Sequence, residues 1–213
     1  MISRKFDERG QAFPIYIVLV AGMLFAAFAF FVFGQAALTR SNAQGAADAA
    51  ALAAARDARD HLVPGLDFAK LDPDDWERIL RGEFLDSTGA CAAASSFAAK
   101  NDASATCTPR AREFAVEVTT NGTVGKSVVP GTDSVHGQAK ATAAIEPRCS
   151  LDAVPAPGPT PYPTATPGPT PVPSPALPVT FNCKGGKALV LDPSKPDPWR
   201  KIARTLFDVR LVD

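Results

Sequence analysis

The N-terminal part of the chain holds two consecutive apolar runs of different character. Residues 14–33 are apolar without a single charged side chain, and about 20 such residues are enough for a helix to cross a bilayer. A helix also satisfies its own backbone hydrogen bonds in lipid. Residues 42–56 then continue mainly in alanine, the strongest helix former. The pattern predicts one long helix, with a transmembrane span at residues 12–38 and a second half outside the membrane.

Further along the chain the apolar period changes from that of a helix to that of a strand. Residues 114–119 and 138–145 alternate apolar and polar side chains, and residues 124–129 form another short strand-like run. Asn121-Gly122 is a turn signal between the first two strands. Three antiparallel strands with one apolar face need a cover, and the second half of the long helix is the obvious candidate. We therefore expect an α+β fold, with the Ala-rich helix packed on a small antiparallel sheet.

A second helix is predicted after Pro64-Gly65, where the long helix is expected to end. Asp72 is a good N-cap, Pro73 suits the first helical position, and the acidic residues that follow suit the positive end of the helix dipole. Gly82 should end this helix. The acidic cluster could also be interpreted as a metal site, but capping explains its carboxylates. Residues 90–106 are expected to be irregular or partly helical.

Residues 154–179 are dominated by proline, mixed with threonine, serine, alanine and glycine. This composition favours an extended polyproline-II linker over a packed core, and the linker could be a spacer, a stalk or a ligand for a partner. Beyond it, residues 188–191 and 207–211 again have strand character. The expected organisation is a cytoplasmic leader at 1–11, the span, an extracytoplasmic α+β domain at 39–153, the linker, and a segment at 180–213 tethered to the domain.

All four cysteines follow the predicted span: Cys91, Cys107, Cys149 and Cys183. An even number in a small exported domain indicates two disulfides, and their spacing is not the Cys-x-x-Cys spacing of zinc or redox sites. Of three possible pairings we favour Cys91–Cys107, which closes a short loop, and Cys149–Cys183, which would clip together the ends of the proline-rich stretch. Four free thiols in a cytosolic domain are the alternative, and they would require the opposite topology.

Basic residues before the span favour a cytoplasmic N-terminus: Arg4, Lys5 and Arg9. Arg40 follows the span and weakens this asymmetry, so the cysteines decide the orientation. We expect a single-pass protein of the cell membrane with its bulk outside the cytoplasm. A cleavable signal peptide is the competing interpretation, with a small-residue site at residues 43–45. The apolar run is longer than such peptides usually carry, and the helical pattern continues through the site.

The same stretch carries a family resemblance. A short charged leader ending in Arg9-Gly10, an apolar helix, then Arg40, Gln44 and the Ala-rich residues 46–53 resemble the N-terminal region of TadE/TadG-like proteins. These are minor pilin-like components of the tight-adherence (Flp) pilus machinery. The match covers roughly residues 9–56, and the strand patterns and proline-rich tail are similar to actinobacterial members. The resemblance implies a cell-envelope assembly component, with the membrane and other pilus-assembly membrane proteins or pilin-like subunits as partners.

Two expectations about individual residues accompany this resemblance. Arg9-Gly10 before an apolar helix is similar to a prepilin peptidase site. Ile15 stands where such pilins commonly carry glutamate, so we expect Gly10 to stay uncut. The second expectation concerns a helix-packing face at helical spacing, where small residues allow close approach. This face packs either on the chain's own sheet or, as we favour from the resemblance, on helices of other subunits. Its members are Ala43, Ala47, Ala50 and Ala54.

Charge balance and the absence of catalytic motifs narrow the functional classes open to this chain. Basic and acidic residues balance at 22 each, so charge gives no argument for a nucleic-acid partner. His61 and His136 are the only histidines, and no nucleophile, phosphate-loop or zincin motif occurs. We expect no enzyme activity, cofactor, metal or small-molecule substrate. The leading function is a minor pilin-like structural or assembly component of a Tad-type (Flp) pilus or related envelope secretion apparatus. The alternative is a membrane-anchored surface-binding module with a proline-rich wall spacer.

Overall fold

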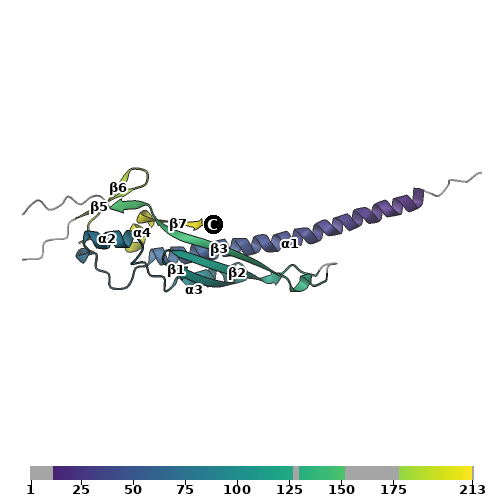
Figure 1. The fold of residues 1–213 in the computed structure, drawn as a ribbon, viewed down its shortest axis with the longest axis horizontal. Coiled ribbons are helices and arrows are strands. Elements are labelled where there is room, and N and C mark those ends of the chain that lie inside the picture. Colours follow the sequence, from purple (N-terminus) through teal and green to yellow (C-terminus); the bar gives the residue numbers. More distant parts are fainter. Residues whose placement is uncertain (1–11, 127–129, 152–177, 213) are drawn as a thin grey trace, which may run out of the picture.

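A single long helix projects from an α+β head in the computed structural model, which describes residues 12–126, 130–151 and 178–212 (Figure 1). This helix, α1 (Ala12–Asp60), has 49 residues and no break between its apolar and Ala-rich parts. Its N-terminal half stands clear of the head, whereas its C-terminal half runs alongside the strands. The predicted continuous helix is confirmed, although it ends at Asp60, before the expected Pro64-Gly65 break.

The head is built on an antiparallel sheet with the strand order β1-β2-β3-β7. Its strands are β1 (Ala103–Arg110), β2 (Glu113–Thr123), β3 (His136–Pro147) and β7 (Phe207–Val212). Along β2, the buried side chains Phe114, Val116 and Val118 alternate with exposed or half-buried ones, as expected for a sheet covered on one face. The C-terminal half of α1 contacts β2 and β3 and covers that face. The expected helix-on-sheet α+β arrangement is therefore confirmed.

A second helix packs beside α1 through small side chains. It is α3 (Ala90–Lys100), which buries Ala90, Ala94 and Ala98 at a spacing of four residues. It contacts both α1 and β1. The buried side chains of α3 and of the C-terminal half of α1 are all alanine, which lets the two helix backbones approach closely.

The end of the head opposite the projecting helix has a different core, built from aromatic residues. It contains η1 (Phe68–Lys70), α2 (Pro73–Leu80), α4 (Trp199–Leu206) and the three-stranded sheet of β4 (Cys149–Leu151), β5 (Val179–Cys183) and β6 (Lys187–Leu191). Phe68 stacks on Trp76 and Trp199, with ring centroids 5.8 and 6.1 Å apart. Trp76 meets Phe181 edge to face at 5.5 Å. These rings join segments that lie far apart in the sequence.

The predicted start of α2 is confirmed in detail. The Asp72 carboxylate accepts a hydrogen bond from the Asp75 backbone N–H at 2.8 Å, and the Asp75 carboxylate accepts one from the Asp72 backbone N–H at 3.4 Å, which completes a capping box. Pro73 occupies the first turn. The helix ends at Leu80, and Gly82 follows with a positive φ of 81°. The capping hydrogen bonds account for two of the carboxylates that could have suggested a metal site.

Two strand predictions need correction. Asn121-Gly122, expected to form a turn, lies within β2, because that strand continues to Thr123 through a register shift after Thr119. Val124 to Lys126, the described part of the expected second strand at 124–129, is not in a strand. Residues 127–129 lie outside the described part of the chain. The connection between β2 and β3 instead contains η2 (Thr132–Ser134).

The segment expected to be irregular or partly helical divides into α3 and the strand β1. The strands predicted near the C-terminus are confirmed as β6 and β7, and β7 returns to the main sheet as the partner of β3. The proline-rich residues 152–177 lie outside the described residues. Their described flanks are neighbours, since Leu151 of β4 pairs with Phe181 of β5 in antiparallel register.

Candidate functional site: the two halves of the long helix

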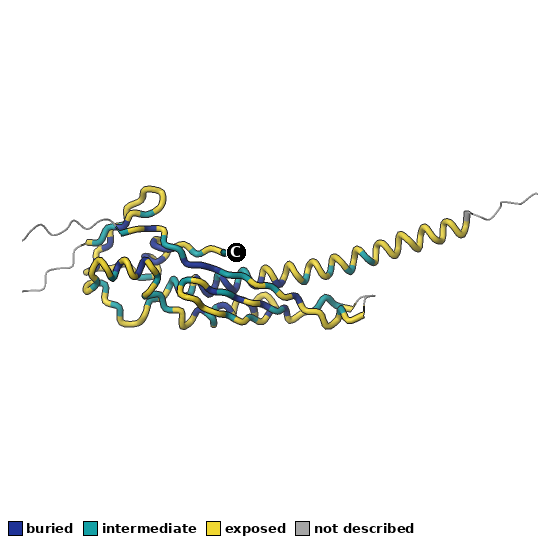
Figure 2. Tube along the Cα trace, viewed as in Figure 1, coloured by how far each residue is buried: buried dark blue, intermediate teal, exposed yellow. Residues whose placement is uncertain are grey.

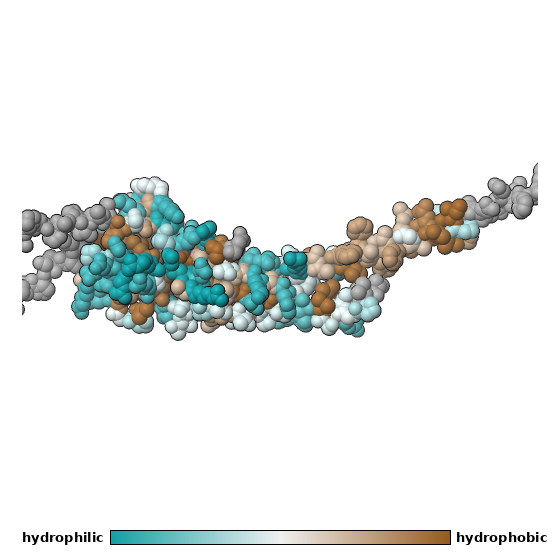
Figure 3. Space-filling model, in the orientation of Figure 1, coloured by the Kyte–Doolittle hydropathy of each residue, from teal (hydrophilic) through white to brown (hydrophobic). Residues whose placement is uncertain are grey.

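Most of the exposed large apolar side chains of the described chain lie on the N-terminal half of α1 (Figure 2). Phe25 and Phe30 are 78% and 80% exposed, and none of the most apolar stretch is buried within the chain. This half is also the strongly hydrophobic end of the molecule (Figure 3). A helix that is apolar on all sides is typical of a lipid environment. Its length and composition are consistent with a single-pass membrane anchor.

The C-terminal half of α1 is buried instead of exposed. All four residues of the expected helix-packing face, Ala43, Ala47, Ala50 and Ala54, are completely buried inside the chain. They lie among the contacts of α1 with β2, β3 and α3. The favoured interpretation, packing on helices of other subunits, therefore needs correction. The small side chains are used by the chain's own sheet and by α3, which leaves that face no surface to offer a partner.

Gly137, near the start of β3, fixes the junction between the two halves. A Cβ atom on Gly137 would lie 2.5 Å from the Thr39 carbonyl oxygen and 3.2 Å from the Ala43 Cβ. The Gly137 backbone N–H also donates a hydrogen bond to the Thr120 Oγ1 at 2.9 Å, and the Thr120 side chain is buried. The absence of a side chain thus lets β3 reach α1 where the apolar half ends, which fixes the sheet against the helix.

Asp60, the last residue of α1, connects this helix to α4 through arginine side chains. Its carboxylate accepts hydrogen bonds from Arg204 at 3.0 Å and Arg59 at 2.9 Å, and the Arg200 Nε lies 3.6 Å away. Burial opposes ionisation of Asp60, but the arginine hydrogen bonds and charges outweigh it and hold the pKa of Asp60 below its ordinary value. The Trp199 indole N–H adds a hydrogen bond of 3.1 Å to the Arg59 carbonyl oxygen.

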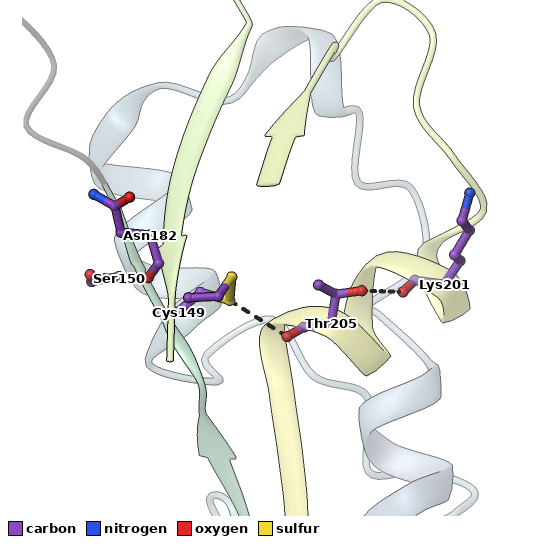
Figure 4. Close-up of a disulfide and its surroundings, with 6 residues drawn as sticks. Cys149, Ser150, Asn182, Lys201 and Thr205 are labelled. Carbon is purple, nitrogen blue, oxygen red and sulfur yellow. Dashed lines mark hydrogen bonds between the residues drawn. A yellow bond between two sulfur atoms is a disulfide. The ribbon is translucent and has the colours of Figure 1, made fainter. Parts of the chain in front are cut away.

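Two disulfides lie in the head. Cys149 and Cys183 face each other across β4 and β5 and are joined, and this bond bridges 34 sequence positions. Figure 4 shows it beside α4, where the Cys149 sulfur lies 3.5 Å from the Thr205 carbonyl oxygen. The second disulfide joins Cys91 of α3 to Cys107 of β1. The pairs are those expected from the sequence, and disulfides favour an extracytoplasmic position for the head.

Comparison with known proteins points to the same helix. Residues 10–57 match the Tad family model, described as Flp pilus-assembly TadE/G-like. Over these residues the chain is similar to TadE/G-like proteins. The match coincides with α1 almost from end to end and includes both its exposed and its buried half. A search of curated proteins finds no match, and a search of solved structures finds none either.

The matched residues thus include both the exposed apolar half of α1 and the half on which the head is assembled. The first matched residue, Gly10, lies outside the described residues. The expectation that prepilin peptidase leaves Gly10 uncut therefore stays a prediction. Within residues 12–126, 130–151 and 178–212, histidine, cysteine and acidic side chains form no group of three suited to a metal ion.

Two important positions were not found from the sequence. Gly137 had a usable signal, because an isolated glycine inside a strand pattern often marks close backbone approach. Asp60 had none, since its partner Arg204 lies 144 positions away in the chain. A third omission, the helix α4, carries a readable signal: Trp199, Ile202, Ala203 and Leu206 have helical spacing, and the last three are buried.

Proposed function

We propose that this chain is a minor pilin-like component of a Tad-type (Flp) pilus or related envelope secretion apparatus. The family description implies a role in Tad pilus assembly. The observation that carries the proposal is the coincidence of the matched residues with α1. The recognised segment is both the candidate membrane anchor and the helix on which the head is built. In this proposal the N-terminus is cytoplasmic and the head is extracytoplasmic.

The apolar half of α1 supplies the contacts with other membrane proteins in this mechanism. The Ala-rich half is buried in its own head, so it is not available to them. Side chains of the apolar half are exposed around the whole helix. In a bilayer, helices associate through close packing rather than through the hydrophobic effect. The neighbours would be other pilus-assembly membrane proteins or pilin-like subunits, and the head would be presented outside the membrane.

The proline-rich segment forms an excursion from the head in this proposal. Support comes from its described flanks, because β4 and β5 pair in antiparallel register and are joined by the Cys149–Cys183 disulfide. The segment therefore leaves and returns at one place. This arrangement suits a spacer or presented loop better than a linker between two independent domains.

Deletion and crosslinking together test this function. A strain lacking the chain should lose surface pili under the electron microscope, and the intact chain should restore them. A photo-crosslinking residue at Phe28, in the exposed apolar half, should capture membrane proteins of the pilus machinery. The same residue at Val190, which is 63% exposed on β6, is the matched control and should capture far less. Normal piliation without the chain would contradict the proposal.

Topology is tested separately with a membrane-impermeant thiol reagent. After mild reduction of intact cells, the reagent should label Cys91 and Cys149, because both lie in the head. Labelling that requires cell lysis would reverse the proposed orientation.

A further inference from the structure

A polar cavity of about 630 Å³ opens beside α1 where its apolar half ends. Three segments line it: the first polar turns of α1, the turn between α3 and β1, and the end of β2. Its volume lies within the usual range for small-molecule sites. Hydroxyl and amide side chains form much of the wall, including Thr39, Ser41, Asn42 and Asn101. One ammonium group, Lys100, and one carboxylate, Asp102, line the same cavity.

A chain of contacts fixes the level of this cavity along α1. Gly137 lies so close to α1 that an added Cβ would collide with the Thr39 carbonyl oxygen, and its N–H donates to the Thr120 Oγ1. The next residue of β2, Asn121, donates its backbone N–H to the Asp102 carbonyl oxygen at 2.7 Å. The turn that carries Lys100 and Asp102 is therefore held at the level of Thr39, the first residue after the apolar half of α1.

For a bilayer that surrounds the uncharged apolar run of residues 14–33, that level lies at the outer side of the headgroup layer, and the polar connection between β2 and β3 extends from it toward the bilayer (Figure 1). Thr39 follows the end of the apolar run by one to six residues, depending on whether the run is taken to end at Leu38 or Phe33. At the helical rise this is about 2–9 Å along the axis. Each headgroup layer is about 5–8 Å thick. A phospholipid next to α1 would therefore place its headgroup beside the cavity.

The two charges of the cavity have no partners of opposite charge in the described part of the chain. Lys100 lies over the Phe97 ring, with its Nζ 4.7 Å from the ring centroid, and forms no ion pair with a described carboxylate. Asp102 likewise forms none with a described cation. Elsewhere on the surface, many charges are paired, as in Lys70–Asp67 and Lys140–Glu117. An unpaired ammonium and an unpaired carboxylate in one cavity complement a ligand that carries both signs.

We propose that this cavity binds the headgroup of a zwitterionic phospholipid with a primary ammonium group, as in phosphatidylethanolamine. Lys100 and the neighbouring hydroxyl and amide groups contact the phosphate, and Asp102 contacts the ammonium. The proposal rests on the membrane anchoring of α1 proposed above, but not on the pilus role. A bound headgroup would add a second attachment to the bilayer and would fix the tilt of the head relative to the membrane.

Lipid retention by the full chain tests this site. The protein is reconstituted in nanodiscs with equal amounts of phosphatidylethanolamine and phosphatidylcholine, extracted in mild detergent, and its retained lipids are counted by native mass spectrometry. The intact chain should prefer phosphatidylethanolamine. Lys100→Gln should lower retention of both lipids by about fivefold, the value for one exposed ion pair of about 1 kcal/mol. Asp102→Asn should remove the preference between the lipids while retaining the phosphate contact.

Two features make these variants informative. Asp102 has a left-handed backbone with φ of 51°, which asparagine tolerates well, so Asp102→Asn should keep the melting temperature of the head. Lys70→Gln is the matched control, because Lys70 is an exposed lysine on η1, in the aromatic part of the head far from the anchor. It should retain lipid like the intact chain.

Equal lipid retention by the intact chain and both cavity variants would overturn the proposal. So would an intact chain without preference between the two lipids, or a co-purified peptide in place of lipid. A chain that does not enter the bilayer would instead contradict the membrane anchor itself, so the two failures are distinguishable.

Discussion

The two halves of α1 are both rich in apolar residues, yet they differ in side-chain size and in burial. The N-terminal half carries phenylalanine, leucine, isoleucine and valine, and these side chains are mostly exposed. The C-terminal half carries alanine, and most of its alanines are fully buried against the sheet and α3. Hydrophobicity alone does not separate the two environments. Side-chain size does.

Different packing requirements explain this division. Lipid tails adapt to any shape, so a membrane-facing helix gains from large apolar surface and needs no fixed complementarity. A helix that lies against a sheet and a second helix must fit a fixed interior at high packing density. Small side chains let the three elements approach closely. The comparison teaches that one helix can be an exposed apolar segment, consistent with a membrane anchor, over one half and part of a packed core over the other, because the size of its residues changes near Thr39.

A polar substitution in the exposed half of α1 should have the largest effect of these variants, and the effect should be on membrane insertion. Phe25→Asp places a carboxylate near the middle of the apolar run, which should make membrane insertion less favourable by about 3–4 kcal/mol on the translocon scale. The fraction of protein in the membrane pellet after carbonate extraction should fall. The head should keep its melting temperature, because Phe25 touches none of its core. Phe25→Leu is the control and should insert normally. A lower melting temperature for Phe25→Asp would contradict the separation of the halves.

A larger side chain in the buried half of α1 should have the next largest effect, and the effect should be on the stability of the head. Ala47→Phe adds a ring to a position with no exposed surface, and overpacking of this kind typically costs about 1–3 kcal/mol. Chemical denaturation of the head should show the loss, with unchanged membrane association. The matched control is Ala27→Phe, at an exposed position of the apolar half, which should leave the stability of the head unchanged. Equal behaviour of the two variants would remove the distinction between the halves.

The junction itself can be tested at Gly137. Gly137→Ala places a Cβ within 2.5 Å of the Thr39 carbonyl oxygen, so β3 must move away from α1, at a cost of about 1–2 kcal/mol. Thermal unfolding should show a lower melting temperature. Gly122→Ala is the control, because a Cβ there meets nothing within 4 Å. A neutral Gly137→Ala would mean that the sheet can shift along the helix without loss.

The smallest expected effect concerns the far end of the buried half. Asp60→Asn weakens the hydrogen bonds from Arg204 and Arg59, with an expected loss of about 1 kcal/mol. Because the folded-state pKa of Asp60 is lowered, its contribution to stability is present above the ordinary aspartate pKa. The contribution is lost as the pH falls below about 4 toward the folded pKa.

The difference in melting temperature between the intact chain and Asp60→Asn should therefore be largest near neutral pH and shrink in acid. Glu117→Gln removes an exposed ion pair with Lys140 and should change stability less. A constant difference between the intact chain and Asp60→Asn down to pH 2 would show that the ionised carboxylate contributes nothing.

Local signals predicted much of this fold. The capping residues around Asp72 predicted α2 because the hydrogen bonds of a cap are formed within four residues. The alternation at Phe207, Val209 and Leu211 likewise predicted β7. The prediction of a turn at Asn121-Gly122 was wrong, because long-range contacts favour the continuation of β2 to Thr123. The Asn121 N–H donates to the Asp102 carbonyl oxygen, and the Gly137 N–H donates to the Thr120 hydroxyl oxygen. These contacts hold β2 extended where local propensity favours a turn.

The sequence by itself determined where α1 changes from an exposed apolar helix, consistent with a membrane anchor, to a buried one, because apolar side chains change from large to small along this helix. It also carried the family signal, which lies in that same helix. Only the tertiary structure decided which neighbour the Ala-rich face meets. A small side chain specifies how closely another element can approach, but it does not specify whether that element belongs to the same chain. Here the sheet and α3 of the same chain bury the face completely, and their covalent link to α1 gives them a higher effective concentration than a separate subunit.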